Sequence, residues 1–194
     1  MPNLIAAETE KYQSAWALDA YAKNSPGASL VPLFLDMAKP QRGSVLDAGC
    51  GSGKGAVALA NEGFAVTMCD LTPDGLTPES AHLPFQSAVL WKDLRPVARQ
   101  TGREWFDYAY CCDVLEHIPT SFSMLVISRL LDVSKHGVFL SISTVHDEYG
   151  SFIGEPLHQT VKPFVWWRDQ IGALARVVEA RDLLINACFW VKAS

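Results

Sequence analysis

The sequence predicts a three-layer α/β fold around a central sheet that is mostly parallel. Between residues 43 and 144, short apolar segments alternate with helical segments. Strands that are apolar throughout are typical of parallel sheets with helices on both faces. A glycine-rich turn follows the first apolar segment. Near the end of the chain, segments 176–184 and 186–194 resemble two strands with almost no linker, a connection that permits only antiparallel pairing.

The N-terminal residues 1–40 are expected to form helices. In the segment 9–23, Tyr12, Trp16 and Ala20 recur at helical spacing, and Thr9 is placed to cap its start. The segment NSPG breaks this pattern. A second helix is expected over 28–39, with a proline near its first turn, where proline is tolerated.

The middle of the chain supplies the strands of the sheet. Gly63 is placed to end a helix that begins after the glycine-rich turn. The segment between the second and third strands is rich in proline and turn residues, so any helix there is expected to be short or absent. The expected strands are SVLDAG, 64–70, a part of 85–94, 106–113 and 137–144, and the further helices are 119–135 and 163–175.

Composition narrows the class of protein. The chain has 194 residues, 49% of them hydrophobic and 19% charged, which fits one globular domain. No apolar run reaches the roughly 20 residues that span a bilayer, and the start does not resemble a secretory signal. A cytoplasmic protein without membrane contact is therefore expected. The net charge of -5 and the scattered basic residues make nucleic acid an unlikely partner.

The five cysteines are expected to be buried, reduced thiols. They include no C-x-x-C pair, which argues against a zinc knuckle or a dithiol redox site. No metal site is predicted.

The glycine-rich turn indicates a nucleotide-like ligand. Glycines let a ligand approach the backbone closely, and the following helix presents free N–H groups. The turn does not match the phosphate-binding G-x-x-x-x-G-K-[ST] loop, because Ala48 stands at its first position and Gly55 at its last. Gly51, Gly53 and Ala56 formally match the dinucleotide fingerprint G-x-G-x-x-G/A, so this alternative stays open.

The full pattern Asp47-x-Gly49-x-Gly51-x-Gly53 resembles the first motif of class I S-adenosylmethionine-dependent methyltransferases. The stretch FDYAYCCDVLEHIP resembles the fourth-strand motif of that family. The resemblance covers residues 43–144 and is closest to small bacterial or phage-type members. It implies a Rossmann-like sheet of seven strands, mostly parallel, that ends in an antiparallel strand.

The resemblance also implies S-adenosyl-L-methionine as the cofactor. Asp47 would hold the turn, Asp70 would bind the ribose hydroxyls, and Asp93 would lie near the adenine amino group. N–H groups of the turn would meet the carboxylate of the ligand. The expected cofactor-binding residues are Asp47, Gly49, Cys50, Gly51, Gly53, Asp70, Leu71, Asp93, Leu94 and Cys111.

The acceptor is expected to bind beyond the fifth strand, because ligands of such sheets lie past the carboxyl ends of the strands. His158 is the first candidate to orient or deprotonate it, followed by His117 and Tyr149. For each of them, and for His117 in particular at a helix start, a purely structural role remains the alternative. Tyr12, Trp16 and Tyr21 form either a lid over the cofactor or simple packing against the sheet.

The predicted organisation is one domain over 1–194. It comprises a helical cap (1–40), a cofactor-binding core (43–144), an acceptor-side loop and helix (145–175) and a terminal strand pair (176–194).

The predicted function is methyl transfer from S-adenosylmethionine to a small-molecule acceptor. The fourth strand is not followed by the [NDS]-P-P-[FYW] step, which argues against amino-methylation of DNA bases. Hydroxyl, nitrogen and carbon acceptors stay open, and the sequence does not predict the oligomeric state. The alternatives are an NAD-dependent oxidoreductase and a non-catalytic module that binds the cofactor.

Overall fold

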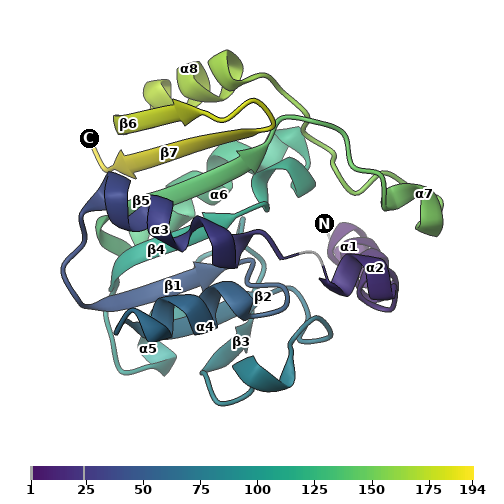
Figure 1. The fold of residues 1–194 in the computed structure, drawn as a ribbon, viewed down its shortest axis with the longest axis horizontal. Coiled ribbons are helices and arrows are strands. Elements are labelled where there is room, and N and C mark those ends of the chain that lie inside the picture. Colours follow the sequence, from purple (N-terminus) through teal and green to yellow (C-terminus); the bar gives the residue numbers. More distant parts are fainter. Residues whose placement is uncertain (1, 24) are drawn as a thin grey trace.

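The central sheet has seven strands in the order β3-β2-β1-β4-β5-β7-β6 (Figure 1). The structure is a computed structural model that describes residues 2–23 and 25–194. Strands β1 to β5 pair in parallel, and β7 pairs antiparallel with both β5 and β6. The predicted topology is therefore confirmed. The strands are β1 (Ser44–Ala48), β2 (Ala65–Asp70), β3 (Phe85–Ser87), β4 (Phe106–Cys112), β5 (Ser134–Ser143), β6 (Arg176–Asp182) and β7 (Asn186–Lys192).

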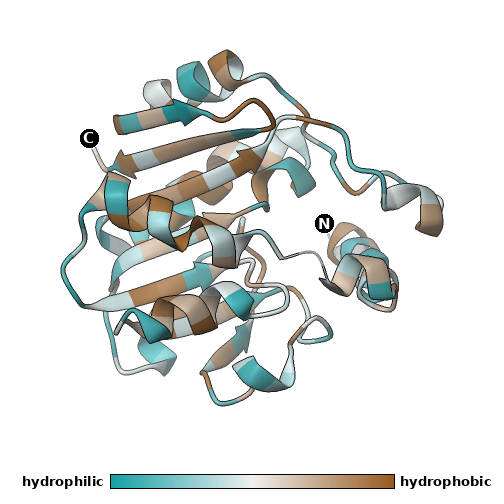
Figure 2. Ribbon diagram, viewed as in Figure 1, coloured by the Kyte–Doolittle hydropathy of each residue, from teal (hydrophilic) through white to brown (hydrophobic). Residues whose placement is uncertain are grey.

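Helices cover both faces of this sheet. On one face lie α3 (Gly27–Ala38) and α4 (Lys54–Asn61), and on the other α5 (Arg95–Gln100), α6 (Thr120–Asp132) and α8 (Phe164–Leu174). Neighbouring residues of β1 show the division, because Val45 packs with α3 and α4 whereas Leu46 packs with α6 and α8. Strands β1, β4, β5 and β7 are mostly buried, and hydrophobic colours predominate on β5 and β7 in Figure 2. The three-layer prediction is confirmed.

A small helical cap lies beyond the carboxyl ends of the parallel strands (Figure 1). It consists of α1 (Pro2–Trp16), α2 (Asp19–Lys23) and α7 (Gly150–Ile153). Short 3-10 turns follow β2 and β4 at Pro78–Ser80 (η1) and Leu115–His117 (η2). The cap is smaller than the predicted 1–40, because the apolar residues of α3 pack on the sheet.

The N-terminal helix differs from the prediction of one helix over 9–23. It begins at Pro2 and breaks at Ala17 and Leu18, before α2. Thr9 lies inside α1, where its hydroxyl donates to the carbonyl of Ile5. A threonine in a helix interior commonly bonds back one turn in this way, so its presence did not mark the helix start.

The segment after β2 also differs from the prediction. Strand β3 covers only Phe85–Ser87, at the edge of the sheet. The chain then turns inward and buries Leu90 and Leu94 in the core. Helix α5 was not predicted, although Pro96 within its first turn is a common helix start.

Two smaller findings complete the fold. None of the helices in the described ranges combines the length and apolarity needed to cross a bilayer. All five cysteines are free thiols, as predicted, and only Cys112 is partly exposed. Burial raises the pKa of Cys111 and Cys112 well above the usual range, which keeps both thiols protonated.

Candidate active site

A cavity of about 510 Å³ is lined by residues at the carboxyl ends of β1, β2, β4 and β5 and by residues of the helical cap. This volume lies within the roughly 300–1,000 Å³ range of small-molecule sites. Nine of the predicted site residues line it, and they come from the glycine loop, the end of β2, η2 and the segment after β5. These are Asp47, Gly49, Cys50, Gly51, Asp70, Leu71, His117, Tyr149 and His158.

The glycine loop, residues 49–53, joins β1 to α4. Gly49 has a φ of 74°, and a Cβ atom there would lie 2.4 Å from Val114. Gly53 also has a φ of 74°, and its Cβ would lie 2.4 Å from Ser80 of η1. Glycine is therefore required at both positions by backbone conformation and close packing. Gly53 does not line the cavity, so its role is to let η1 pack against the start of α4.

Most N–H groups of this loop donate to acceptors within the protein, and the expectation that loop N–H groups meet a ligand carboxylate stays a prediction. Gly49 and Cys50 donate to the carbonyl of Cys69, at 2.8 and 3.1 Å. Gly51 donates to Asp70, at 2.8 Å. These bonds tie the loop to β2, because β1 and β2 are parallel neighbours whose carboxyl ends meet at the same edge.

Asp47 is buried at the end of β1, and its Oδ2 has no hydrogen-bond partner among the described residues. Burial, and secondarily the neighbouring Asp70 carboxylate, raise the pKa of Asp47 to about 7, and the backbone N–H of Ala56 in α4 partly offsets the shift. A buried carboxylate oxygen without a partner is costly. Because Asp47 lines the cavity, a ligand that carries a donor or a positive charge would satisfy it.

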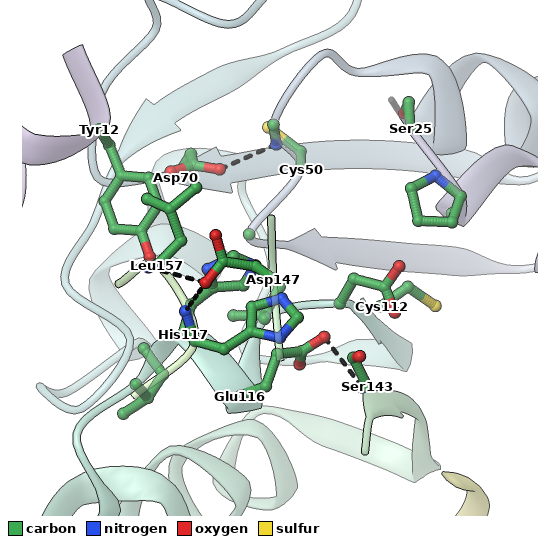
Figure 3. A pocket seen from close by; sticks show the side chains of 18 of the residues that line it. Tyr12, Ser25, Cys50, Asp70, Cys112, Glu116, His117, Ser143, Asp147 and Leu157 are labelled. Carbon is green, nitrogen blue, oxygen red and sulfur yellow. Dashed lines mark hydrogen bonds between the residues drawn. The ribbon is translucent and has the colours of Figure 1, made fainter. Parts of the chain in front are cut away.

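Asp70 ends β2 on the glycine-loop side of the cavity (Figure 3). Its two carboxylate oxygens accept the N–H groups of Gly51 and Leu71, at 2.8 and 2.6 Å. Burial raises its pKa, and these backbone bonds act against the shift. A carboxylate offers about four acceptor positions, so Asp70 retains capacity for ligand hydroxyls.

Four residues that were predicted to bind the cofactor lie outside the cavity wall. Asp93 is exposed and pairs with Arg95, at 2.8 Å. Leu94 and Cys111 are buried in the hydrophobic core, and Gly53 packs against η1. The wall near Leu71 comes from Ala88, Val89, Leu90 and Trp91. The sequence prediction missed this segment because the early end of β3 redirects the chain.

Helix α1 closes one side of the cavity through Tyr12 and Trp16, as the lid prediction proposed. Trp16 packs closely over the glycine loop, because a Cβ on Gly51 would lie 3.0 Å from its ring. The Tyr12 hydroxyl is buried without a partner among the described residues. Both side chains therefore contribute to the binding cavity in addition to packing α1.

Buried polar contacts hold α1 against the acceptor side. Glu8 pairs with Lys11, and both side chains are buried. The Gln159 amide donates to Glu8 at 3.0 Å and to the carbonyl of His117 at 2.9 Å. Helix α1, η2 and the segment after β5 thus form one connected wall.

His117 and His158 lie edge to face, with ring centroids 4.7 Å apart. The pKa of His117 falls to about 3, mainly because its ring is removed from water and secondarily because His158 is near. Nδ1 of His158 lies 2.7 Å from the carbonyl of Val145. A carbonyl only accepts, so Nδ1 carries a proton, and Nε2 is the ring nitrogen left for other contacts.

Asp147 holds the backbone around His158 in place. Its carboxylate accepts the N–H groups of Gly150, Leu157 and His158, at 2.5, 3.0 and 3.0 Å. Tyr149 lines the cavity beside this turn and lies against Tyr21 of α2, with ring centroids 5.8 Å apart. All three catalytic candidates are therefore brought to one side of the cavity.

Two acidic residues after β4, neither of them among the predicted site residues, also line the cavity. Asp113 lines the cavity with a φ of 52°, and its Oδ1 accepts from Asn186, at 3.0 Å. Burial raises its pKa to about 6. Glu116 is fully buried, accepts the Ser143 N–H at 2.9 Å and leaves Oε2 without a partner among the described residues (Figure 3). Burial, and secondarily Asp113, raise its pKa well above the usual range.

Within the described ranges, one group of side chains could hold a metal ion. Glu116, His117 and His158 each offer a ligand atom, and these atoms lie within 4.8 Å of one another. The sequence prediction contained no metal site. The trio stands on the acceptor side of the cavity.

A family model described as a methyltransferase domain matches residues 19–183. The ubiquinone biosynthesis O-methyltransferase of Shewanella sp. (strain ANA-3) is 29% identical over 158 residues, which cover 77% of this chain and 65% of the relative. The chain thus spans slightly less than two thirds of the length of this curated relative.

Solved structures agree on the fold. The 1,6-didemethyltoxoflavin-N1-methyltransferase of Burkholderia thailandensis, with bound S-adenosylhomocysteine, has a TM-score of 0.69 at 16% identity and covers 100% of this chain and 91% of its own. The magnesium protoporphyrin IX methyltransferase of Synechocystis PCC 6803, with bound SAH, has a TM-score of 0.60 at 19% identity. It covers 87% of this chain and 82% of its own.

Proposed function

Because the chain belongs to the methyltransferase-domain family, we propose that it transfers a methyl group from S-adenosylmethionine to a small-molecule acceptor. The observation that carries the proposal is the cavity, in which the glycine loop and Asp70 face a separate group of polar side chains after β4 and β5. One end suits an adenosine and the other suits an acceptor.

The residues at the first end fit S-adenosylmethionine. Asp47 has a buried oxygen without a partner, which suits the amino group of the ligand. Asp70 has acceptor capacity for the ribose hydroxyls, and Trp91 and Leu71 offer apolar surface for the adenine. When bound, the ligand supplies an electrophilic methyl group on a sulfonium.

The residues at the second end can orient an acceptor and take its proton. Nε2 of His158 is the ring nitrogen left to contact an acceptor, and Asp147 and Val145 hold the backbone and ring of His158 in place. Proton transfer to a positioned base contributes to catalysis when the acceptor must lose a proton. His117 stays neutral because its pKa is lowered, so it can accept or donate one hydrogen bond. Tyr12 and Trp16 of α1 cover one side of the cavity.

Calorimetry with S-adenosylhomocysteine and NADH, side by side, tests this function. We expect binding of S-adenosylhomocysteine only. Binding of NADH alone would support the oxidoreductase alternative, which is already weakened because Gly53 of its fingerprint does not line the cavity. Binding without methyl loss across a broad acceptor screen would instead support a non-catalytic module.

The similarity to an O-methyltransferase of ubiquinone biosynthesis and to small-molecule methyltransferases supports a small-molecule acceptor. The expectations that nucleic acid is not a partner and that the protein is cytoplasmic stay predictions.

A further inference from the structure

The cavity wall carries an unusual balance of charge. Among its described lining residues are seven carboxylic acids and no lysine or arginine. The acids are Glu8, Asp47, Asp70, Asp113, Glu116, Asp147 and Glu148. A partly buried site with this balance disfavours an anionic ligand, because a lower local dielectric strengthens repulsion between like charges.

Four of these acids are accounted for by other roles. Asp47 and Asp70 belong to the cofactor end. Glu8 is neutralised by Lys11, and Asp147 accepts three backbone N–H groups. Glu148 is exposed at the mouth of the cavity. The acids that remain inside are Asp113 and Glu116.

Asp113 and Glu116 form an acidic pair that is built into the fold. Asp113 holds the left-handed backbone region, in which a non-glycine residue is uncommon. Within the described chain, the hydrogen bonds from Asn186 and Ser141 both end on its Oδ1, at 3.0 and 3.5 Å, so Oδ2 is left for a ligand. Oε2 of Glu116, also without a partner, is fully buried. Oε2 of Glu116 therefore lacks a donor among the described residues, and Oδ2 of Asp113 is free to accept one from a ligand.

The physical chemistry of methyl acceptors separates the candidate classes. A phenol or carboxylic acid attacks most readily as an anion, and a nearby carboxylate disfavours that anion. An amine binds as a cation, attacks as the neutral base and becomes a cation again in the product. A nearby carboxylate stabilises both cationic forms.

We infer that the acceptor is an amine, held by the acidic pair Asp113–Glu116, which acts as the specificity-determining element for the proposed methyl transfer. The bound ammonium gives a proton to Nε2 of His158. The nitrogen lone pair then forms the N–CH₃ bond as the S–CH₃ bond of the sulfonium donor breaks, and that electron pair returns to sulfur. The products are an N-methylated ammonium and neutral S-adenosylhomocysteine, and the proton on His158 passes to solvent.

Binding of matched probes to the protein saturated with S-adenosylhomocysteine tests the inference. The probes are phenethylamine, phenethyl alcohol and phenylpropanoate. Their binding is measured by calorimetry. We expect the amine to bind roughly tenfold or more tightly than the alcohol, the scale of one charge-assisted hydrogen bond, and phenylpropanoate not to bind. Failure of S-adenosylhomocysteine itself to bind would refute the proposed function, whereas the probe series addresses the acceptor alone.

Substitutions of the acidic pair test whether these two residues cause the preference for an amine. Asp113→Asn is close to isosteric, and asparagine tolerates the left-handed region, so the fold should persist. This variant should bind phenethylamine roughly 10- to 100-fold more weakly and keep its affinity for the alcohol and for S-adenosylhomocysteine. Glu116→Gln should also weaken amine binding. Glu104→Gln, an exposed residue ahead of β4, is the charge-matched control and should bind like the wild type.

Three results would overturn the inference: no amine binding, equal binding of the amine and the alcohol, or unchanged amine affinity in Asp113→Asn. Catechol binding that requires added magnesium chloride and exceeds amine binding would also overturn it. In that case the acidic pair would serve a metal ion together with His117 or His158.

Discussion

Replacing Asp47 by asparagine should stabilise the protein without ligand, and more so at high pH than at low pH. Asp47 is buried, and its Oδ2 has no partner among the described residues. Burial and the neighbouring Asp70 carboxylate raise its pKa from 3.8 to about 7. The folded protein therefore binds this proton more tightly than the unfolded chain does. Between these two values unfolding releases a proton, so the contribution of Asp47 to stability falls as the pH rises.

The size of the stability change follows from the pKa shift of Asp47. A shift from 3.8 to about 7 corresponds to about 4 kcal/mol of lost stability once the pH is above both values, at about 1.4 kcal/mol per pKa unit. Part of this loss is already present at pH 5. The stabilising effect of Asp47→Asn should therefore grow by about 2–3 kcal/mol between about pH 5 and pH 8.

Urea unfolding of wild type and variant at both pH values measures this difference. Asp169→Asn is the matched control, because Asp169 is exposed and its ion pair with Arg168 lies at the surface. Asp47→Asn should also bind S-adenosylhomocysteine more weakly than the wild type, since the ligand amino group loses its charged partner. A stability difference that does not change with pH would refute the assigned burial of an unpaired carboxylate.

Three other substitutions test the remaining architecture. Gly49→Ala should lower the free energy of unfolding by roughly 2–4 kcal/mol, because its Cβ would lie 2.4 Å from Val114; an unchanged urea midpoint would contradict the loop geometry. Asp70→Asn should weaken S-adenosylhomocysteine binding by roughly 1.5–3 kcal/mol in calorimetry, because an amide cannot accept from both ribose hydroxyls while it holds the loop; full affinity in the folded variant would argue against the ribose assignment. Gln159→Ala should speed hydrogen exchange in α1, because the amide links Glu8 to η2; exchange identical to that of the wild type would show that α1 is held by packing alone.

Local patterns in the sequence were sufficient to predict much of the cofactor end of the cavity. A run of apolar residues that ends in Asp47, followed by alternate glycines, specified β1 and its turn, since strand propensity and glycine backbone freedom act over a few residues. The position of Asp70 at the end of the next apolar run followed from the same logic. Parallel strands place their carboxyl ends together, so these residues met as expected.

Local sequence patterns were not sufficient to predict the path of the chain after β2. Asp93 was assigned to the cofactor from its distance along the chain, yet the early end of β3 and the start of α5 turned it to the surface. Turn-rich segments leave several backbone paths open, and packing chooses among them. Leu90 and Leu94 selected the observed path by entering the core.

The sequence predicted His117, Tyr149 and His158 for the acceptor end, but tertiary structure decided which buried contacts surround them. Asp113 meets Asn186 across 73 residues, and Glu8 meets Gln159 across 151. No periodicity encodes such pairs, because they exist only once β7 has inserted beside β5 and α1 has closed over the sheet. The sequence determined where a nucleoside could bind, since that device is built from consecutive residues. Folding decided which acids remained unpaired in the cavity, since partners for buried charges come from distant segments.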